Sequence, residues 1–202
     1  QHNKKNCFIA ASPEKLISKT GKEFSTEALA GSISKDDKKY KKILKDKKEL
    51  KEHRFVVDDI KDKLKNKIKS IDIKNNPVIK TYNHIHHLYT PINGELNKKY
   101  HIIDLLVDLY PTSAILGSPK DIALSNIKSN EKFDRGWYGG CFGWFDNNGD
   151  GRFDVSIRST LIQKNTLYLF AGSGIVKNSN EKDEWNETEI KFKQILSPFI
   201  QE

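Results

Sequence analysis

The sequence is poor in the features that mark secreted and membrane-spanning proteins. It contains only two cysteines, Cys7 and Cys141, too few for a scaffold held together by disulfides. Its first residues, 1–6, are polar and lack the apolar stretch of a signal peptide. No apolar run approaches the roughly 18 residues that a membrane-spanning helix needs. We therefore expect a cytoplasmic protein with reduced thiols and no membrane partner.

Methionine is absent altogether, and the chain begins with Gln1. Because translation starts at methionine, this beginning predicts that the 202 residues are part of a longer protein. Hydrophobic residues make up 36% of the chain and charged residues 31%, which is a polar composition. Aromatic residues, which disordered chains usually lack, nevertheless reach 10%. The composition therefore predicts one folded domain with a core.

Positive charge is concentrated in one segment. Lysine and arginine total 35 against 27 acidic residues, a net charge of +8, and residues 35–69 hold most of the excess. The aromatic residues cluster elsewhere, around 133–145, and not among the lysines as base-stacking platforms would. The lysine-rich segment also carries the apolar stripe of an amphipathic helix, formed by Val57, Ile60, Leu64, Ile68 and Ile71. We interpret the lysines as a solvated helix face and expect no nucleic-acid partner.

Hydrophobic periodicity and turn residues predict a mixed fold. Helices are expected over residues 36–45, 47–70, 98–109, 119–128 and 181–196, the last capped by Asn178, Ser179 or Asn180. Strands are expected over residues 7–11, 15–19, 22–26, 78–83, 85–90, 138–145, 152–162 and 166–171. Strands followed by helices and then by strands again indicate an α+β fold with antiparallel sheets.

Two glycine-containing motifs imitate ligand-binding loops. Residues 146–151 match the start of an EF-hand, but its twelfth position is Ile157 where calcium binding requires Glu, and the flanks are strand-like. We therefore predict a hairpin turn there. Gly172 and Gly174 follow a predicted strand without the remaining residues of a nucleotide-binding fingerprint. They indicate only that the backbone closely approaches another group.

Three histidines, His84, His86 and His87, suggest a transition-metal site. On an extended segment, however, His86 and His87 would face opposite sides, and no cysteine lies nearby in sequence. We favour a single polar histidine that points into a pocket.

Glutamates occur in matching pairs on two predicted helices. Glu49 and Glu52 are one helical turn apart, as are Glu184 and Glu187, and Lys191 follows Glu187 by one further turn. Carboxylate oxygens on two helices suit Mg²⁺, which prefers oxygen ligands. The same spacing is also common among exposed salt-bridge partners, so the pattern by itself leaves both interpretations open.

Eight short motifs occur in the order found in the chorismate-utilising enzymes, which the chain resembles over essentially its whole length. They are ASPE (11–14), TEALAG (26–31), KELKEH (48–53), HLYTP (87–91), YGG with GW (138–140 and 143–144), IRS (157–159), FAGSGIV (170–176) and EWNET (184–188). Within that family, the chain is most similar to the isochorismate synthases of menaquinone or phylloquinone synthesis.

The resemblance implies an α+β fold in which antiparallel sheets pack as a sandwich with flanking helices. Residues 1–202 would form the C-terminal portion of a single chorismate-binding catalytic domain, incomplete at its N-terminus. The implied activity is that of an isomerase, the Mg²⁺-dependent conversion of chorismate to isochorismate. Water adds at C2 while the C4 hydroxyl leaves, and the product feeds menaquinone, phylloquinone, siderophore or salicylate synthesis. Chorismate would be the only partner of a monomer.

The resemblance also implies a role for individual residues. Glu14 matches the general acid, and the family's general base, a lysine, would precede this chain. Glu52 and Glu187 match the Mg²⁺ ligands, supported by Glu49 and Glu184. Substrate-binding positions are matched by Arg158, Gly172, Gly174, Lys191 and His87.

Sister enzymes of the family form anthranilate, aminodeoxychorismate or salicylate and remain an alternative. Two residues, Leu29 and Ala114, favour the water-using isochorismate synthases, since the sisters tend to have Thr where this chain has Ala114. Ser113, where the family usually has Pro, counts against this choice. A second alternative is an inactive truncated remnant, and a third is a binding module that uses the basic segment.

Overall fold

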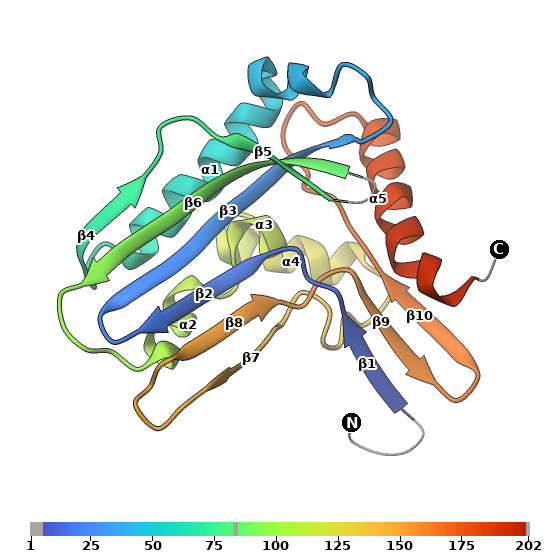
Figure 1. The fold of residues 1–202 in the computed structure, drawn as a ribbon. Helices are drawn as coiled ribbons and strands as arrows, with labels where there is room; N and C mark the ends of the chain where they lie inside the picture. Colours follow the sequence, from blue (N-terminus) through green and yellow to red (C-terminus); the bar gives the residue numbers. More distant parts are fainter. Residues whose placement is uncertain (1–5, 83–84, 201–202) are drawn as a thin grey trace.

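The structure, a computed structural model, describes residues 6–82 and 85–200 and contains two antiparallel sheets (Figure 1). The larger sheet has seven strands in the order β4-β6-β3-β2-β8-β7, and β5 also pairs with β6. These strands are β2 (Lys15–Thr20), β3 (Glu23–Ser34), β4 (Ile68–Ile73), β5 (Val78–Thr81), β6 (Ile85–Leu96), β7 (Cys141–Phe145) and β8 (Gly151–Val155). The smaller sheet consists of β1 (Asn6–Ala10), β9 (Ser159–Gln163) and β10 (Thr166–Phe170).

Helices flank the larger sheet, which confirms the predicted α+β class. They are η1 (Tyr40–Lys45), α1 (Lys47–Leu64), α2 (Ile102–Leu109), α3 (Ser113–Leu116), α4 (Lys120–Asn130), α5 (Glu181–Leu196) and η2 (Ser197–Phe199). Helix α5 has the predicted bounds and is capped by Asn180, whose side chain accepts hydrogen bonds from two backbone amides of the first turn. No helix in the described ranges is long and apolar enough to cross a membrane.

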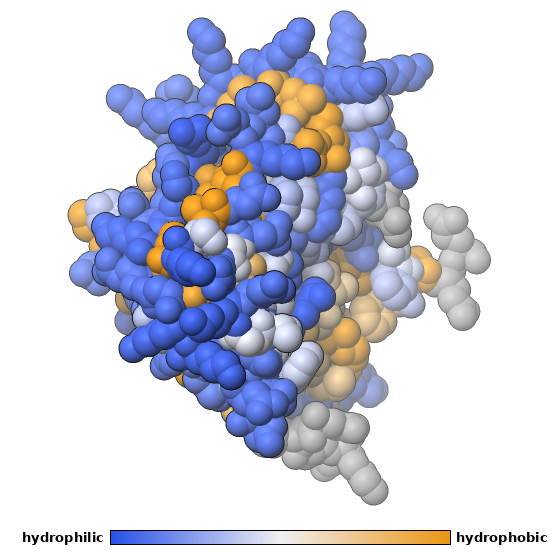
Figure 2. Space-filling view, turned by 60° about the vertical axis from the view of Figure 1, so that its left-hand side comes forward, coloured by the Kyte–Doolittle hydropathy of each residue, from blue (hydrophilic) through white to orange (hydrophobic). Residues whose placement is uncertain are grey.

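The main core lies between α1, α2 and the larger sheet. The buried stripe of α1 packs there with apolar residues of the sheet and of α2: Val56, Val57, Ile60, Leu64, Ala28, Ile92, Leu96, Ile102 and Leu105. Each large apolar side chain buried in this way contributes about 1.5–3 kcal/mol. The opposite side of α1 is exposed, and the face of the molecule in Figure 2 is largely hydrophilic. The lysine-rich segment is therefore a solvated surface over the core.

Several predicted elements differ from the structure in their bounds: the strands predicted over 22–26 and 85–90 extend to Ser34 and Leu96, and the helix predicted over 36–45 is a 3-10 helix over Tyr40–Lys45. Two further elements differ in kind or in sheet. The helix predicted over residues 47–70 ends at Leu64, whose carbonyl accepts the Lys67 amide, and the chain then forms β4. Ile68 and Ile71 satisfy the helical spacing but lie on this strand, because β6 supplies hydrogen-bonding partners that the local sequence does not reveal. The strand predicted over residues 152–162 is two strands, β8 and β9, which belong to different sheets. The break falls at Arg158, which has a left-handed φ of +50°.

The EF-hand-like loop forms the predicted hairpin turn, between β7 and β8. Its first carboxylate, Asp146, accepts backbone hydrogen bonds from Asn148 and Asp150, both at 2.9 Å. The acidic side chain therefore stabilises the turn itself, as Asp commonly does.

Candidate active site

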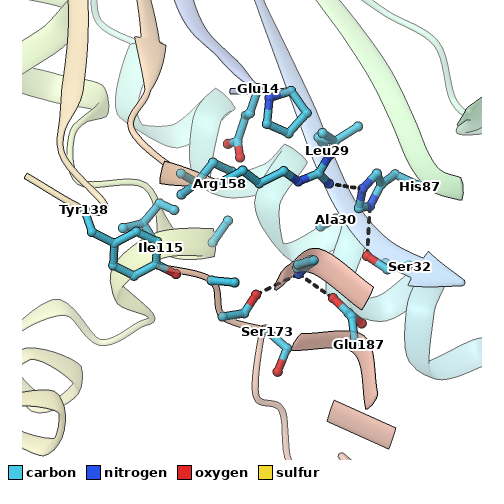
Figure 3. Close-up of a pocket in the computed structure, with 18 of the residues that line it drawn as sticks. Glu14, Leu29, Ala30, Ser32, His87, Ile115, Tyr138, Arg158, Ser173 and Glu187 are labelled. Atoms are coloured by element: carbon cyan, nitrogen blue, oxygen red, sulfur yellow. Dashed lines mark hydrogen bonds and ion pairs between the residues drawn. The ribbon is translucent and has the colours of Figure 1, made fainter. Parts of the chain in front are cut away.

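A cavity of about 200 Å³ lies where the two sheets, α1 and α5 meet (Figure 3). Its lining comes from segments that are far apart in the sequence. It includes most of the residues that the sequence singled out: Glu14, Leu29, Glu52, His87, Ala114, Arg158, Gly172, Gly174, Glu187 and Lys191. Glu49 and Glu184 do not line it. They bond instead to Lys48 beside it.

Glu14 enters the cavity from the segment between β1 and β2. Its amide donates to Ser12 Oγ at 3.2 Å, and its carbonyl accepts the Val155 amide at 3.0 Å. The side chain is 5% exposed. Burial, with the nearby carboxylate of Glu27 adding to it, raises the pKa of Glu14 to about 8. At neutral pH this carboxyl group therefore carries a proton that it can donate.

Arg158 is oriented by a short chain of hydrogen bonds (Figure 3). Its Nη2 lies 2.6 Å from His87 Nε2, and His87 Nδ1 lies 2.8 Å from Ser32 Oγ. Because arginine can only donate, His87 Nε2 accepts and Nδ1 bears the proton. Burial, and then the charge of Arg158, holds the pKa of His87 well below its usual range, which agrees with a neutral ring. Arg158 Nε is buried without a partner among the described residues, so this donor is left unsatisfied in the structure.

The loop that follows β10 brings two glycines to the cavity, and α5 brings a second cation, Lys191. Lys191 Nζ donates to the carbonyl of Gly172 at 2.8 Å and to Glu187 Oε1 at 2.6 Å. A Cβ atom on Gly174 would lie 2.7 Å from Glu52 Oε1, and one on Gly172 would lie 2.8 Å from the Tyr138 hydroxyl. A side chain at either position would have to displace the Glu52 carboxylate or the Tyr138 hydroxyl.

The four predicted metal-site glutamates face one another across α1 and α5. Lys48 Nζ bonds to Glu184 Oε1 at 2.7 Å and lies 3.4 Å from Glu49 Oε1. No hydrogen-bond donor in the described part of the chain reaches the Glu52 carboxylate. Burial raises the pKa of Glu52 to about 7, and the carboxylates of Glu49 and Glu187 act in the same direction.

Three of the four carboxylates therefore pair with two ammonium groups, those of Lys48 and Lys191, whereas Glu52 pairs with no cation among the described residues. This all-oxygen donor set, with its surplus of negative charge, fits the chemistry of Mg²⁺. In the residues that the structure describes, no three His, Cys, Asp or Glu side chains already enclose a metal position. The magnesium ligands thus stay a prediction that the donor chemistry favours.

The histidine segment does not form a transition-metal site in the described residues. His86 bonds to Thr81 Oγ1 and stacks on Tyr40, away from the cavity, and His87 faces Arg158. His84 lies outside the described residues. Of the two histidines of this segment that the structure describes, His87 lines the cavity and His86 does not.

Several lining residues were not assigned a role from the sequence. Ser32 supports His87, Tyr138 lies against Gly172, and Arg135 pairs with Glu131 at 2.5 Å. Tyr138 belongs to one of the eight motifs, so the sequence contained a signal that this residue lies near the site. For Ser32, no local pattern indicates a cavity, because its partner His87 is 55 residues away. Arg135 and Glu131 are four residues apart, but that spacing does not distinguish a cavity lining from an ordinary surface ion pair.

Comparison with known proteins identifies relatives. The chain is 39% identical over 196 residues to the isochorismate synthase MenF of Bacillus subtilis, which covers 94% of this chain and 42% of that relative. It is 38% identical over 192 residues to the salicylate biosynthesis isochorismate synthase of Pseudomonas aeruginosa, covering 92% and 40%. Among solved structures, MenF, the menaquinone-specific isochorismate synthase from Escherichia coli, matches with a TM-score of 0.83 at 34% identity, over 96% of this chain and 46% of that one.

The chain thus spans less than half the length of these three relatives. Its match to the family model described as chorismate binding enzyme extends over residues 1–199, which is nearly the whole chain. On this evidence, the chain belongs to the family of chorismate binding enzymes.

Proposed function

We propose that the protein containing this chain converts chorismate to isochorismate with the help of Mg²⁺. The observation that carries the proposal is that a protonated Glu14 and two cations, Arg158 and Lys191, line one cavity. The names of the relatives support the choice of product within the family. They also suggest that the product enters menaquinone or salicylate synthesis.

The cations of the cavity suit a substrate with two carboxylates. The Arg158 guanidinium offers an unpaired buried donor to one carboxylate, and Lys191 adds a second positive charge. The backbone of residues 172–174 can approach the substrate closely because Gly172 and Gly174 have no side chains. A bound Mg²⁺, held by Glu52 and Glu187, would neutralise negative charge on the substrate.

Glu14 is the proton donor of the proposed reaction. Water forms a bond to C2, the ring double bonds shift, and the C4–oxygen bond breaks with its electron pair leaving on oxygen. The Glu14 proton converts that departing hydroxyl to water, while a base takes the proton of the attacking water. The resemblance assigns that base to a lysine outside these 202 residues.

Product analysis tests the reaction. We expect the protein, produced from its complete gene, to form isochorismate from chorismate and Mg²⁺ at the same rate with and without ammonium. Anthranilate, aminodeoxychorismate or salicylate as the main product would contradict the proposal.

The role of Glu14 has its own test. We expect Glu14→Gln to lower kcat by about 10²–10⁴-fold, the usual contribution of a general acid. In the unaltered protein, kcat should fall as the pH rises through about 8, because the acid loses its proton there. The exposed Glu23→Gln serves as a control that removes a carboxylate elsewhere on the sheet. Full activity of Glu14→Gln would rule out this assignment.

A further inference from the structure

The pairing of β2 with β3 stops before β2 reaches Glu14. Backbone partners run from Thr20↔Glu23 to Ser18↔Ser25 and then end. The pairing of β2 with β8 also has an irregularity, between Lys15 and Ile17. The start of β2 therefore separates from β3 just where the chain turns into the cavity.

Where the backbone pairing ends, two side chains of β3 form hydrogen bonds with the backbone of β2 instead. Thr26 Oγ1 donates to the carbonyl of Leu16 at 2.7 Å, and Glu27 Oε1 accepts the amide of Lys15 at 2.9 Å. Both side chains are buried, Glu27 with 6% of its surface exposed. The Lys15 amide belongs to the peptide group that joins it to Glu14, so the Glu27 carboxylate bonds directly to the backbone that carries Glu14.

We propose that Glu27 is a positioning residue, whose carboxylate sets the place of Glu14 and puts a negative charge beside it. The inference rests on the proposed function, in which Glu14 donates a proton. A like charge nearby favours the protonated form of a carboxyl group, and Glu27 acts on the pKa of Glu14 in that direction, second only to burial.

Other charged groups surround this pair. Arg158 and Lys191 face Glu14 and oppose the effect of Glu27. The groups near Glu27 come from four strands: Lys15 on β2, Lys80 on β5, Tyr89 on β6 and Arg152 on β8. Lys80 Nζ lies 3.5 Å from Glu27 Oε2 and partly balances its charge.

Two substitutions separate the two parts of this role. Glu27→Gln keeps an oxygen that can accept the Lys15 amide but removes the charge. We expect its kcat at low pH to stay within about threefold of the unaltered protein, and the alkaline fall of kcat to move about one pH unit lower. Glu27→Ala also loses the acceptor, so we expect kcat to fall about tenfold or more at every pH, because Glu14 is displaced.

Two controls make the pH shift interpretable. Lys80→Gln removes the cation next to Glu27 and should move the alkaline fall in the opposite direction, to higher pH. Glu23→Gln removes an exposed charge of the same strand and should leave the fall unchanged. Thermal unfolding of each variant reports whether the fold is retained.

These measurements separate a failure of the Glu27 role from a failure of the proposed function. If kcat depends on Glu14 and falls near pH 8, but Glu27→Gln shifts that fall no more than Glu23→Gln does, the role of Glu27 is refuted and the function stands. If the unaltered protein shows no alkaline fall, or Glu14→Gln keeps its kcat, then the assignment of Glu14 fails and this inference with it.

Discussion

Arg158 combines a left-handed backbone conformation with a side chain that is fixed by its hydrogen bond to His87. Its left-handed φ of +50° turns the chain between the two sheets, and His87 bonds to one end of its guanidinium at 2.6 Å. Its buried Nε is left without a partner among the described residues. A planar cation that is fixed in place loses little freedom when it binds a carboxylate, so this residue should contribute mainly to affinity.

Arg158→Lys should therefore raise KM for chorismate much more than it lowers kcat. A hydrogen bond to a charged group contributes about 1.5–3 kcal/mol, so we expect KM to increase by about tenfold or more. Steady-state kinetics on the complete protein measure both constants. Arg152→Lys, at an exposed arginine paired with Asp154, should leave KM unchanged. An unaltered KM in Arg158→Lys would place substrate binding elsewhere.

At the scale of elements, β3 connects the core to the acidic cluster. Its pairing with β6 is interrupted between Ala30 and Ser32, so that Gly31 forms a bulge with φ of +79°. Next to the bulge, the Ser32 amide donates to Glu49 Oε2 at 3.0 Å. A Cβ atom on Gly31 would lie 3.1 Å from the same oxygen. The bulge thus determines how closely α1 can bring Glu49 to the sheet.

Gly31→Ala should both strain the backbone and displace Glu49. The left-handed conformation costs a non-glycine residue about 1–2 kcal/mol of folding free energy. Gly21→Ala provides the matched control, since its φ is +60° and nothing lies within 4 Å of the added Cβ. We expect both variants to lose about 1–2 kcal/mol in denaturant unfolding, but only Gly31→Ala to weaken Mg²⁺ binding in calorimetry. Equal Mg²⁺ affinity in the two variants would contradict this account.

At the scale of the whole molecule, the acidic cluster joins α1 and α5, two helices that are more than 100 residues apart in the sequence. The ion pair between Lys48 and Glu184 connects the first turn of α1 with the first turn of α5. A divalent cation between Glu52 and Glu187 would link the same two helices. Metal binding should therefore stabilise the folded molecule and not only assist the reaction.

We expect Mg²⁺ to raise Tm of the complete protein, and EDTA to reverse the increase. A ligand at a hundred times its Kd stabilises the folded state by about 2.7 kcal/mol, which corresponds to a few degrees. Glu187→Gln should abolish the response, whereas Glu189→Gln, at an exposed position on the same helix, should retain it. If Tm of the Glu187→Gln protein still rises with Mg²⁺, the metal binds at another place.

The sequence by itself determined the features that depend on neighbours along the chain. The stripe on α1, the whole of α5 and the turn between β7 and β8 follow from periodicity, capping and turn residues, which act over a few positions. The ordered motifs likewise predicted the family, and ten of the site residues that the resemblance implied line the cavity.

Only the tertiary structure decided where distant segments meet. Pairing with β6 turns residues 68–73 into a strand instead of the end of a helix, and the backbone of Arg158 divides one predicted strand between two sheets. The contacts of Ser32 with His87, and of Glu27 with the Lys15 amide, join residues 55 and 12 positions apart. Such contacts arise because buried polar groups must find partners in three dimensions, and no local pattern records which partner they find.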